Sequence, residues 1–176
     1  MKVPKLAFRI ATGAMLAHFA SLALAQTCVA GTRASSPMSI YVVDSVTGTV
    51  TDRRTALMWD RCPLGLSGSA CAVGAASTFT WQAALNAAVT IGTYKGYNDW
   101  RLPNLRELRS LVEECRINPS INEFVFPNTT VSFFWSGSPN AGIATYASWY
   151  VDFNLGASDI GPRSLAVPVR LVRAGQ

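Results

Sequence analysis

The alternation of apolar and polar positions predicts a series of short strands where the structured part of the chain begins. Residues 41–43 and 49–51 are rich in β-branched and aromatic side chains, and Thr47-Gly48 between them favours a tight turn. Polar residues 52–55 form a second turn signal that leads into the mostly apolar residues 56–59. We therefore expect a β-hairpin that is extended into a short meander.

The apolar period becomes helical in the next two segments. Beyond Thr80, a candidate N-cap, apolar residues recur at helical spacing up to Gly92, which favours a stop. A second helix has a clearer start, because Pro103 precedes Asn104 and Glu107 completes a capping box. The two expected apolar faces are Trp81, Ala84, Leu85, Ala88 and Val89, and Leu105, Leu108, Leu111, Val112 and Cys115.

Strand-like segments return in the last third of the chain. Residues 131–135, 148–153 and 167–172 are rich in β-forming side chains and are separated by Ser, Pro, Asn and Gly. Strands, then two helices, then strands within one domain predict an α+β fold with the helices packed on short antiparallel sheets. We expect all five tryptophans in its core, namely Trp59, Trp81, Trp100, Trp135 and Trp149.

The N-terminus has the composition of an export signal. Lys2, Lys5 and Arg9 precede an apolar, Ala-rich stretch, and Ala23-Leu24-Ala25 offers small residues to a signal peptidase. The stretch is short for a membrane span of ~20 residues, so we expect cleavage rather than an anchor. The expected division is a signal peptide at 1–25, a tail with the first strand at 26–45, and the folded domain at 46–176.

Removal of this signal changes the charge of the chain and takes away its only histidine. Taking 25 residues and three basic side chains from 176 residues and 15 Lys and Arg leaves 151 residues with 12 basic and 10 acidic groups. A net charge near +2 gives little support for nucleic-acid binding, and no later apolar run is long enough to span a bilayer. Without His18, catalysis by Ser-His-Asp or Cys-His groups is excluded, as are the His-containing zinc sites.

Other cofactor and metal motifs are absent from the sequence. We find no phosphate-binding or dinucleotide-binding glycine pattern. Asp44, Asp152 and Asp159 could contribute to a calcium site, but none of them belongs to an Asp-x-Asp-x-Asp-Gly loop. We therefore expect no cofactor and no metal.

The four cysteines after the signal favour two disulfides, since their number is even and the chain is exported. Three pairings exist. Cys62 and Cys71 flank a loop rich in Pro, Gly and Ser, so we pair them, which leaves Cys28 to tie the tail to Cys115. A four-cysteine metal site is the alternative, but it would lack the usual Cys-x-x-Cys pairs.

Several short blocks of sequence occur in an order that resembles a known domain family. Residues 50–59 and 80–85 are followed by Asn98-Asp99-Trp100-Arg101-Leu102-Pro103-Asn104-Leu105-Arg106-Glu107-Leu108. Further blocks occur at 126–129, 134–136, 149–153 and 169–173. With these blocks, about residues 48–173 of the chain resemble the Lcl C-terminal domain family, which is named after a bacterial collagen-like surface adhesin.

The resemblance implies a C-type-lectin-like fold outside the cytoplasm, and adhesion with sulfated glycans as ligands. The chain departs from the family at Ala56, where Gly is usual, and at Leu171, where many members have Cys. No collagen-like tract precedes the domain. The Glu-Pro-Asn and Trp-Asn-Asp signatures of calcium-dependent lectins are absent, so calcium-dependent sugar binding is not expected.

Basic and aromatic residues outside the expected core are the candidate ligand contacts. Arg106, Arg109 and Arg116 project to one side of a continuous second helix, where guanidinium groups could bind sulfate. The alternative is a salt-bridged surface, because Glu113 follows Arg109 by four residues. The remaining candidates are Arg53 and Arg54 beside the first hairpin, and Tyr94 and Tyr97 in a Gly-containing connection, where aromatic rings could stack on sugars.

Arg101, unlike the other arginines, is not a candidate ligand contact. It stands between two expected core residues, so we interpret it as structural and paired with Asp99, Asp152 or Glu107.

These observations favour a non-enzymatic binding module in the periplasm, at the cell surface or secreted, with a glycan or an envelope protein as partner. A structural or assembly protein of the cell envelope is the alternative. A carboxylate-based hydrolase is a third hypothesis, although the spacing of the ten acidic residues singles out no pair. The oligomeric state is left open.

Overall fold

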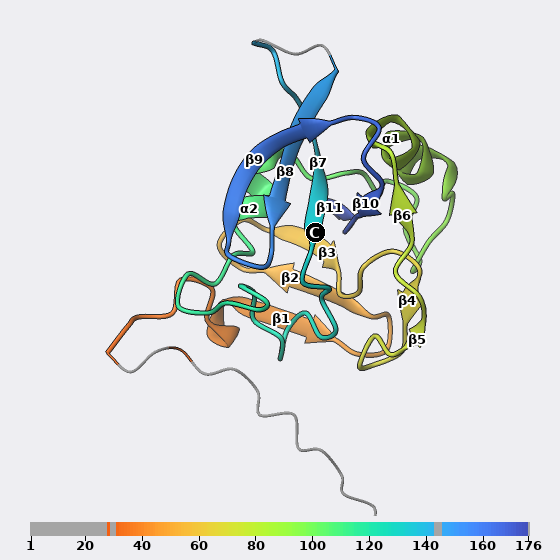
Figure 1. The fold of residues 1–176 in the computed structure, drawn as a ribbon. Coiled ribbons are helices and arrows are strands. Elements are labelled where there is room, and N and C mark those ends of the chain that lie inside the picture. The colour runs from red at the N-terminus through yellow and green to blue at the C-terminus, as the bar shows by residue number, and fades with distance from the viewer. Residues whose placement is uncertain (1–27, 29–30, 143–145, 176) are drawn as a thin grey trace, which may run out of the picture.

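A computed structural model describes residues 28, 31–142 and 146–175 of the chain. Figure 1 shows several short antiparallel sheets with one helix between them and one at the side. Residues 1–25, the expected signal peptide, lie outside the described residues. Within the described residues, no helix has the length and apolar character of a membrane span.

Most of the strands belong to two antiparallel sheets. The four-stranded sheet has the order β1-β2-β3-β11, and the three-stranded sheet has the order β7-β8-β9. The four-stranded sheet consists of β1 (Tyr41–Asp44), β2 (Thr49–Asp52), β3 (Leu57–Asp60) and β11 (Val172–Ala174). The three-stranded sheet consists of β7 (Phe133–Pro139), β8 (Ala147–Asp152) and β9 (Ala157–Pro162).

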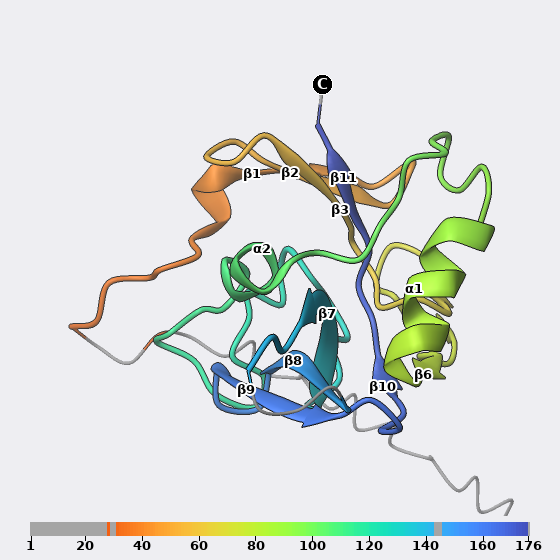
Figure 2. The ribbon, with the colours of Figure 1, turned by 90° about the horizontal axis from the view of Figure 1, so that it is seen from above.

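Short elements complete the fold. The two-stranded sheets pair β4 (Leu66–Ser67) with β5 (Val73–Gly74), and β6 (Thr78–Phe79) with β10 (Val167–Pro168). The helices are a 3-10 turn η1 (Met38–Ile40), α1 (Trp81–Thr90) and α2 (Leu105–Arg109). Figure 2 shows α2 between the two larger sheets and α1 beside β6 and β10. The chain is therefore a mixed α+β protein, as its order of elements predicts.

Two apolar clusters form the core. One joins the facing sides of the larger sheets to α2, and Trp59, Leu108 and Phe134 in it are fully buried. The other lies under α1 and contains Trp81, Trp100 and Trp135. Four tryptophans are thus buried as predicted, whereas Trp149 is half-buried.

The first meander agrees with its sequence pattern. β1 pairs with β2 through the Thr47-Gly48 turn, and β2 pairs with β3 through the turn at 53–56. Gly48 has φ +70°, a conformation that favours glycine, while Ala56 adopts φ +55°. The turn between β2 and β3 therefore places a residue with a side chain in the left-handed region.

The second helix is shorter than its apolar pattern predicts. Asn104 and Glu107 form the expected capping box, but α2 ends at Arg109 instead of continuing to residue 115. Local turn hydrogen bonds continue to Val112 N, and tertiary pairing then takes over, since Glu113 N bonds to Ser120 O and Val112 bridges Ile121. The prediction of a long helix was wrong, since a local pattern does not contain these distant partners.

Other local expectations also needed correction. α1 has the predicted bounds, but Thr80 makes no side-chain cap and Val89 is 82% exposed rather than part of the apolar face. The expected strand at 167–172 is divided into β10 and β11, with buried Arg170 between them. β9 was not predicted.

Both disulfides pair as expected from the sequence. Cys62 bonds to Cys71 across the β4–β5 loop, and Cys28 bonds to Cys115. The second bond attaches the N-terminal tail to the loop that follows α2.

Candidate functional site

Two adjoining hollows share Asn104 and together form what we call the Asn104 groove. The first has a volume of about 270 Å³ and the second about 410 Å³. The first hollow is lined by Leu85, Ala88, Val89, Arg101, Leu102, Asn104 and Gly137. The second is lined by Asn104, Leu105, Arg106, Ser138, Pro139 and Trp149. The groove thus runs from α1 past the start of α2 to the end of β7 and to β8.

The chain around Asn104 is held by short local and tertiary hydrogen bonds. Asn104 Oδ1 accepts from Glu107 N at 2.9 Å, while Glu107 Oε2 accepts from Asn104 N at 2.7 Å. Gly137 N donates to Pro103 O at 2.7 Å, and Leu105 N donates to Ser138 Oγ at 3.0 Å. These bonds fix the groove floor before any ligand arrives.

Gly137 forms part of the floor of the first hollow. A Cβ at this position would make ordinary van der Waals contacts, 3.4 Å from Leu102 Cβ and 3.6 Å from Pro103 O. Leu85 and Val89 of α1 make the opposite wall apolar. This hollow therefore suits an apolar substituent.

Arg101 forms one rim of the groove and is already paired. Its Nη1 and Nη2 contact Glu107 Oε2 and Oε1 at 2.7 and 2.8 Å, so the pair is bidentate. The bond to Arg101 holds the pKa of Glu107 below its usual value, and the pKa of Arg101 is raised in turn. Of the three partners predicted for Arg101, Glu107 is the correct one.

Arg106 and Trp149 give the second hollow a cationic group and an aromatic ring. Among the described residues, no group forms a hydrogen bond or ion pair with the Arg106 guanidinium, which lies on the exposed side of α2. The Trp149 indole is half-buried, and its N–H likewise lacks a partner within the described part of the chain. A hollow that offers both an uncommitted cation and an aromatic ring can bind an anionic ligand that also has an apolar face.

The other two arginines predicted on this side lie elsewhere. Arg109 Nη1 donates to Ser158 Oγ at 3.1 Å and to Gly156 O at 3.3 Å, both near β9. Arg116 lies beyond the end of α2, with its guanidinium 5.9 Å from the centre of the Phe124 ring. The prediction of one helical face with three arginines was therefore wrong, because the helix stops at Arg109.

Glu113 is not the intrahelical partner of Arg109 that the sequence offered as an alternative. Its carboxylate is buried and accepts hydrogen bonds from Ser35 N and Ser36 N at 2.8 and 2.9 Å. The nearest carboxylate oxygen to Arg109 belongs instead to Glu114, at 3.9 Å.

Arg53 and Arg54 also lie outside the groove. Arg54 Nε is 3.6 Å from Asp52 Oδ1, and its Nη1 donates to Ser35 O at 3.2 Å. Arg53 is exposed, its backbone N–H donates to Ile40 O, and no residue in the described part of the chain pairs with its guanidinium. These residues border the first hairpin, as their place in the sequence indicates.

The structure places Tyr94 and Tyr97 against Trp100 rather than in the groove. Both rings meet the indole edge to face, with ring centres 6.0 and 6.4 Å away. The Arg173 guanidinium lies 3.9 Å from the centre of the Tyr97 ring, and Tyr94 Oη donates to Asp60 Oδ2 at 3.0 Å. Burial, followed by the Asp60 charge, raises the pKa of Tyr94.

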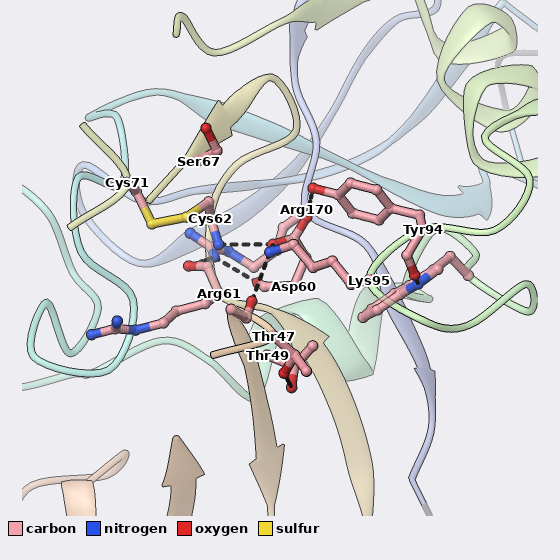
Figure 3. Close-up of polar contacts among 12 residues, drawn as sticks. Thr47, Thr49, Asp60, Arg61, Cys62, Ser67, Cys71, Tyr94, Lys95 and Arg170 are labelled. Atoms are coloured by element: carbon pink, nitrogen blue, oxygen red, sulfur yellow. Dashed lines mark hydrogen bonds and ion pairs between the residues drawn. A yellow bond between two sulfur atoms is a disulfide. The ribbon is translucent and has the colours of Figure 1, made fainter. Parts of the chain in front are cut away.

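Asp60 is the centre of a buried polar cluster that sequence reasoning missed (Figure 3). Its Oδ1 lies 2.6 Å from Lys95 Nζ and accepts from Cys62 N at 3.0 Å. Arg170 Nη1 donates to the backbone O of Asp60 at 2.9 Å, and its Nη2 donates to Thr129 Oγ1 at 2.8 Å. Burial lowers the pKa of Arg170 to about 10, so it remains charged at neutral pH.

The described residues include one group of potential metal ligands, Cys28, Glu113 and Cys115. The two sulfurs are bonded to each other, so they cannot act as thiolate ligands. The aspartates considered for calcium each accept a hydrogen bond from a neighbouring backbone N–H: Asp44 Oδ1 from Val46, Asp152 Oδ1 from Asn154, and Asp159 Oδ1, within β9, from Ile160.

A comparison with protein families places most of the chain in one of them. The model of the Lcl C-terminal domain matches residues 48–173, which include every residue that lines the Asn104 groove. No curated protein matches the chain.

Proposed function

The chain belongs to the Lcl C-terminal domain family, and from this premise we propose that it is an exported, non-enzymatic module that binds an anionic glycan in the Asn104 groove. The observation that carries the proposal is that Arg106, whose guanidinium is uncommitted among the described residues, and Trp149 line the same hollow. Sugar rings stack on aromatic side chains through their apolar faces, and a guanidinium matches sulfate or carboxylate oxygens. The proposal includes a C-type-lectin-like arrangement of the α+β elements.

Two features support export. The chain has two disulfides, which persist in oxidising compartments such as the periplasm or the cell exterior. Its first 25 residues have the composition of a secretory signal.

The test measures binding of the oxidised, signal-free protein to a sulfated oligosaccharide by calorimetry at low and high salt. Arg106→Gln should weaken binding about tenfold or more, since a charge-assisted hydrogen bond contributes ~1.5–3 kcal/mol. Trp149→Ala should also weaken binding, and the effect of salt should be smaller in the Arg106 variant. Arg53→Gln is the matched control, because Arg53 is exposed and lies outside the groove. Equal affinity of the Arg106 variant and the native protein would contradict the proposal.

A protein partner in the cell envelope is the second candidate, and the exposed Val89 favours it. Val89 is 82% exposed and lines the apolar hollow with Leu85 and Leu102, which suits an apolar side chain of a partner. Cross-linking in the envelope should then capture a partner that Val89→Asp loses and Arg106→Gln keeps. Loss of glycan binding in both variants, with no captured protein, would favour the glycan.

A further inference from the structure

The Cys28–Cys115 disulfide lies against a buried carboxylate, outside the Asn104 groove. The Cys115 sulfur is 3.0 Å from Glu113 Oε1, and one ligand atom from each of Cys28, Glu113 and Cys115 lies within 4.8 Å of the other two. A disulfide sulfur carries no hydrogen, so this contact between sulfur and oxygen is not a hydrogen bond in the oxidised protein. Two sulfurs and one carboxylate are therefore gathered at one point of the fold.

The carboxylate of Glu113 is buried and has no cation beside it. Its residue is 1% exposed, and no Lys or Arg in the described part of the chain forms an ion pair with it. Oε1 accepts from Ser35 N and Ser35 Oγ, whereas Oε2 accepts only from Ser36 N among the described residues. A carboxylate oxygen has two lone pairs, so Oε2 keeps one for a further partner. Hydrogen bonds to a carboxylate also orient it when it binds a metal.

The tail that carries Cys28 has attachments that do not involve the disulfide. Besides the bonds to the buried carboxylate, Arg54 Nη1 donates to Ser35 O at 3.2 Å. Asn122 Nδ2 donates to Ser36 O at 3.2 Å. A short segment separates Ser35 from Cys28, so this cysteine remains tethered beside its partner when the two sulfurs are no longer bonded.

A surface hollow gives access to this cluster. Its volume is about 320 Å³, and it is lined by Thr32, Arg33, Glu114 and Cys115. This volume exceeds the ~30 Å³ share of one liquid water several times, so a reductant or a hydrated ion can enter. Cys62 and Cys71 are 1% and 0% exposed, so the second disulfide is shielded from solvent. A reductant should therefore open the Cys28–Cys115 bond first.

We propose that Cys28 and Cys115, once reduced, form a zinc site with Glu113. An external dithiol supplies two electrons and two protons, which convert the S–S bond into two thiols, and the dithiol itself becomes a disulfide. Zinc binding then releases the two thiol protons, and two thiolates and the carboxylate coordinate the ion.

The ligand set matches the chemistry of zinc. Zinc takes thiolate and carboxylate ligands in a tetrahedral arrangement, and water can occupy the fourth position. Zinc–sulfur distances of ~2.3 Å set the two thiolates roughly 3.8 Å apart, so the sulfurs separate as the ion enters. This site is independent of the proposed function of the Asn104 groove, because the two share no residue.

The experiment opens this disulfide in the signal-free protein with a limiting amount of a phosphine reductant. Alkylation and peptide mapping check that the Cys62–Cys71 bond stays closed. Co²⁺ then serves as a spectroscopic probe for zinc: a single ion should bind with the near-ultraviolet absorption of sulfur–cobalt bonds, and Zn²⁺ should displace it. The oxidised protein should show no such absorption. If reduction loosens the fold, zinc should restore the native near-ultraviolet circular dichroism, because a metal that binds only the folded state stabilises it.

Two variants separate this site from unspecific binding to thiols. With Cys28→Ala and Cys115→Ala together, reduction of the remaining cysteine pair should create no cobalt site. In the reduced native protein, Glu113→Gln should weaken Co²⁺ binding about tenfold or more, since losing even a supporting partner of a metal ligand costs about 10–100-fold. Asp159→Asn is the matched control and should leave binding unchanged, because it removes an exposed carboxylate outside the cluster.

Three results would each overturn the proposal. The first is absence of sulfur–cobalt absorption in the reduced native protein. The second is equal absorption in the reduced variant that lacks Cys28 and Cys115. The third is equal affinity for Co²⁺ in the Glu113→Gln variant and the native protein.

Discussion

At the scale of single residues, the buried carboxylate of Glu113 attaches the N-terminal tail to the folded domain. It accepts hydrogen bonds from Ser35 N, Ser36 N and Ser35 Oγ, at 2.8, 2.9 and 3.0 Å. These bonds fasten the N-terminal tail beside the Cys28–Cys115 disulfide. A carboxylate offers only acceptors, which matches three donors directed at it.

Glu113→Gln should therefore destabilise the protein. The amide turns an N–H group toward at least one of the backbone donors, and an unsatisfied buried group costs about 1–3 kcal/mol. Glu114→Gln is the matched control, since Glu114 is exposed and its closest cation is 3.9 Å away, and its effect should stay within about 0.5 kcal/mol. Urea unfolding measures both values. A loss for Glu113→Gln no larger than that of the control would contradict this account.

Residue identity alone did not reveal the Asp60 cluster. Lys95 is the only lysine after residue 5, yet its partner Asp60 lies 35 positions away in sequence. Arg170 reaches the backbone of Asp60 across 110 positions. Such contacts depend on the complete fold, so a pattern within one segment cannot predict them.

At the scale of elements, α2 shows which half of a helix a sequence can predict. Its start depends on Asn104 and Glu107, which lie three residues apart, so the capping box was predictable. Its end depends on the bond between Glu113 N and Ser120 O, and on the bridge between Val112 and Ile121. Tertiary pairing overrode an apolar period that would have continued the helix.

The capping box also predicts a dependence of stability on pH. Arg101 holds the pKa of Glu107 below its usual value. The stabilisation is therefore fully present above the unfolded-state pKa of ~4.3, and it is lost as the pH falls through the lower folded-state pKa. Glutamine keeps the capping geometry without the charge.

Glu107→Gln should thus lower the free energy of unfolding at pH 7 by a few tenths to about 1 kcal/mol, since the pair is partly exposed. The difference from the native protein should shrink below about pH 4. Denaturant unfolding across this range measures it, with Glu114→Gln as the control. A difference that stays constant with pH would exclude the electrostatic explanation.

Some of the strands could likewise be predicted from local sequence and others could not. The turns joining β1, β2 and β3 are local, so both hairpins could be predicted from residues 41–59. β9 was missed because Ala157–Pro162 contains one β-branched residue, Ile160, and ends in Gly-Pro. This strand forms through pairing with all six residues of β8 rather than through its own propensity.

At the scale of the whole molecule, the order of elements predicts the α+β class, but not the groove. The groove joins α1, the segment around Asn104, the end of β7 and Trp149 of β8. Arg106 was among the residues singled out from the sequence, whereas Trp149 was interpreted as core. Its half-exposure comes from its place at the end of the groove, which only the tertiary arrangement determines.

The two disulfides should contribute unequally to the stability of the molecule, because they close loops of very different length. The Cys28–Cys115 bond spans 87 positions and the Cys62–Cys71 bond spans 9. Cross-linking restricts the unfolded chain more when the closed loop is longer, which predicts about 4–5 kcal/mol for the first bond and about 2–3 kcal/mol for the second.

Pairwise replacement of the cysteines by alanine, followed by urea unfolding, tests this order. Cys62 and Cys71 are buried in a small apolar cluster, so their replacement also removes packing. This narrows the expected difference between the two double variants in the free energy of unfolding that each loses. Cys28→Ala with Cys115→Ala should still cause the larger loss. If the short-loop pair proved the more costly, the packing of the β4–β5 loop would outweigh chain entropy.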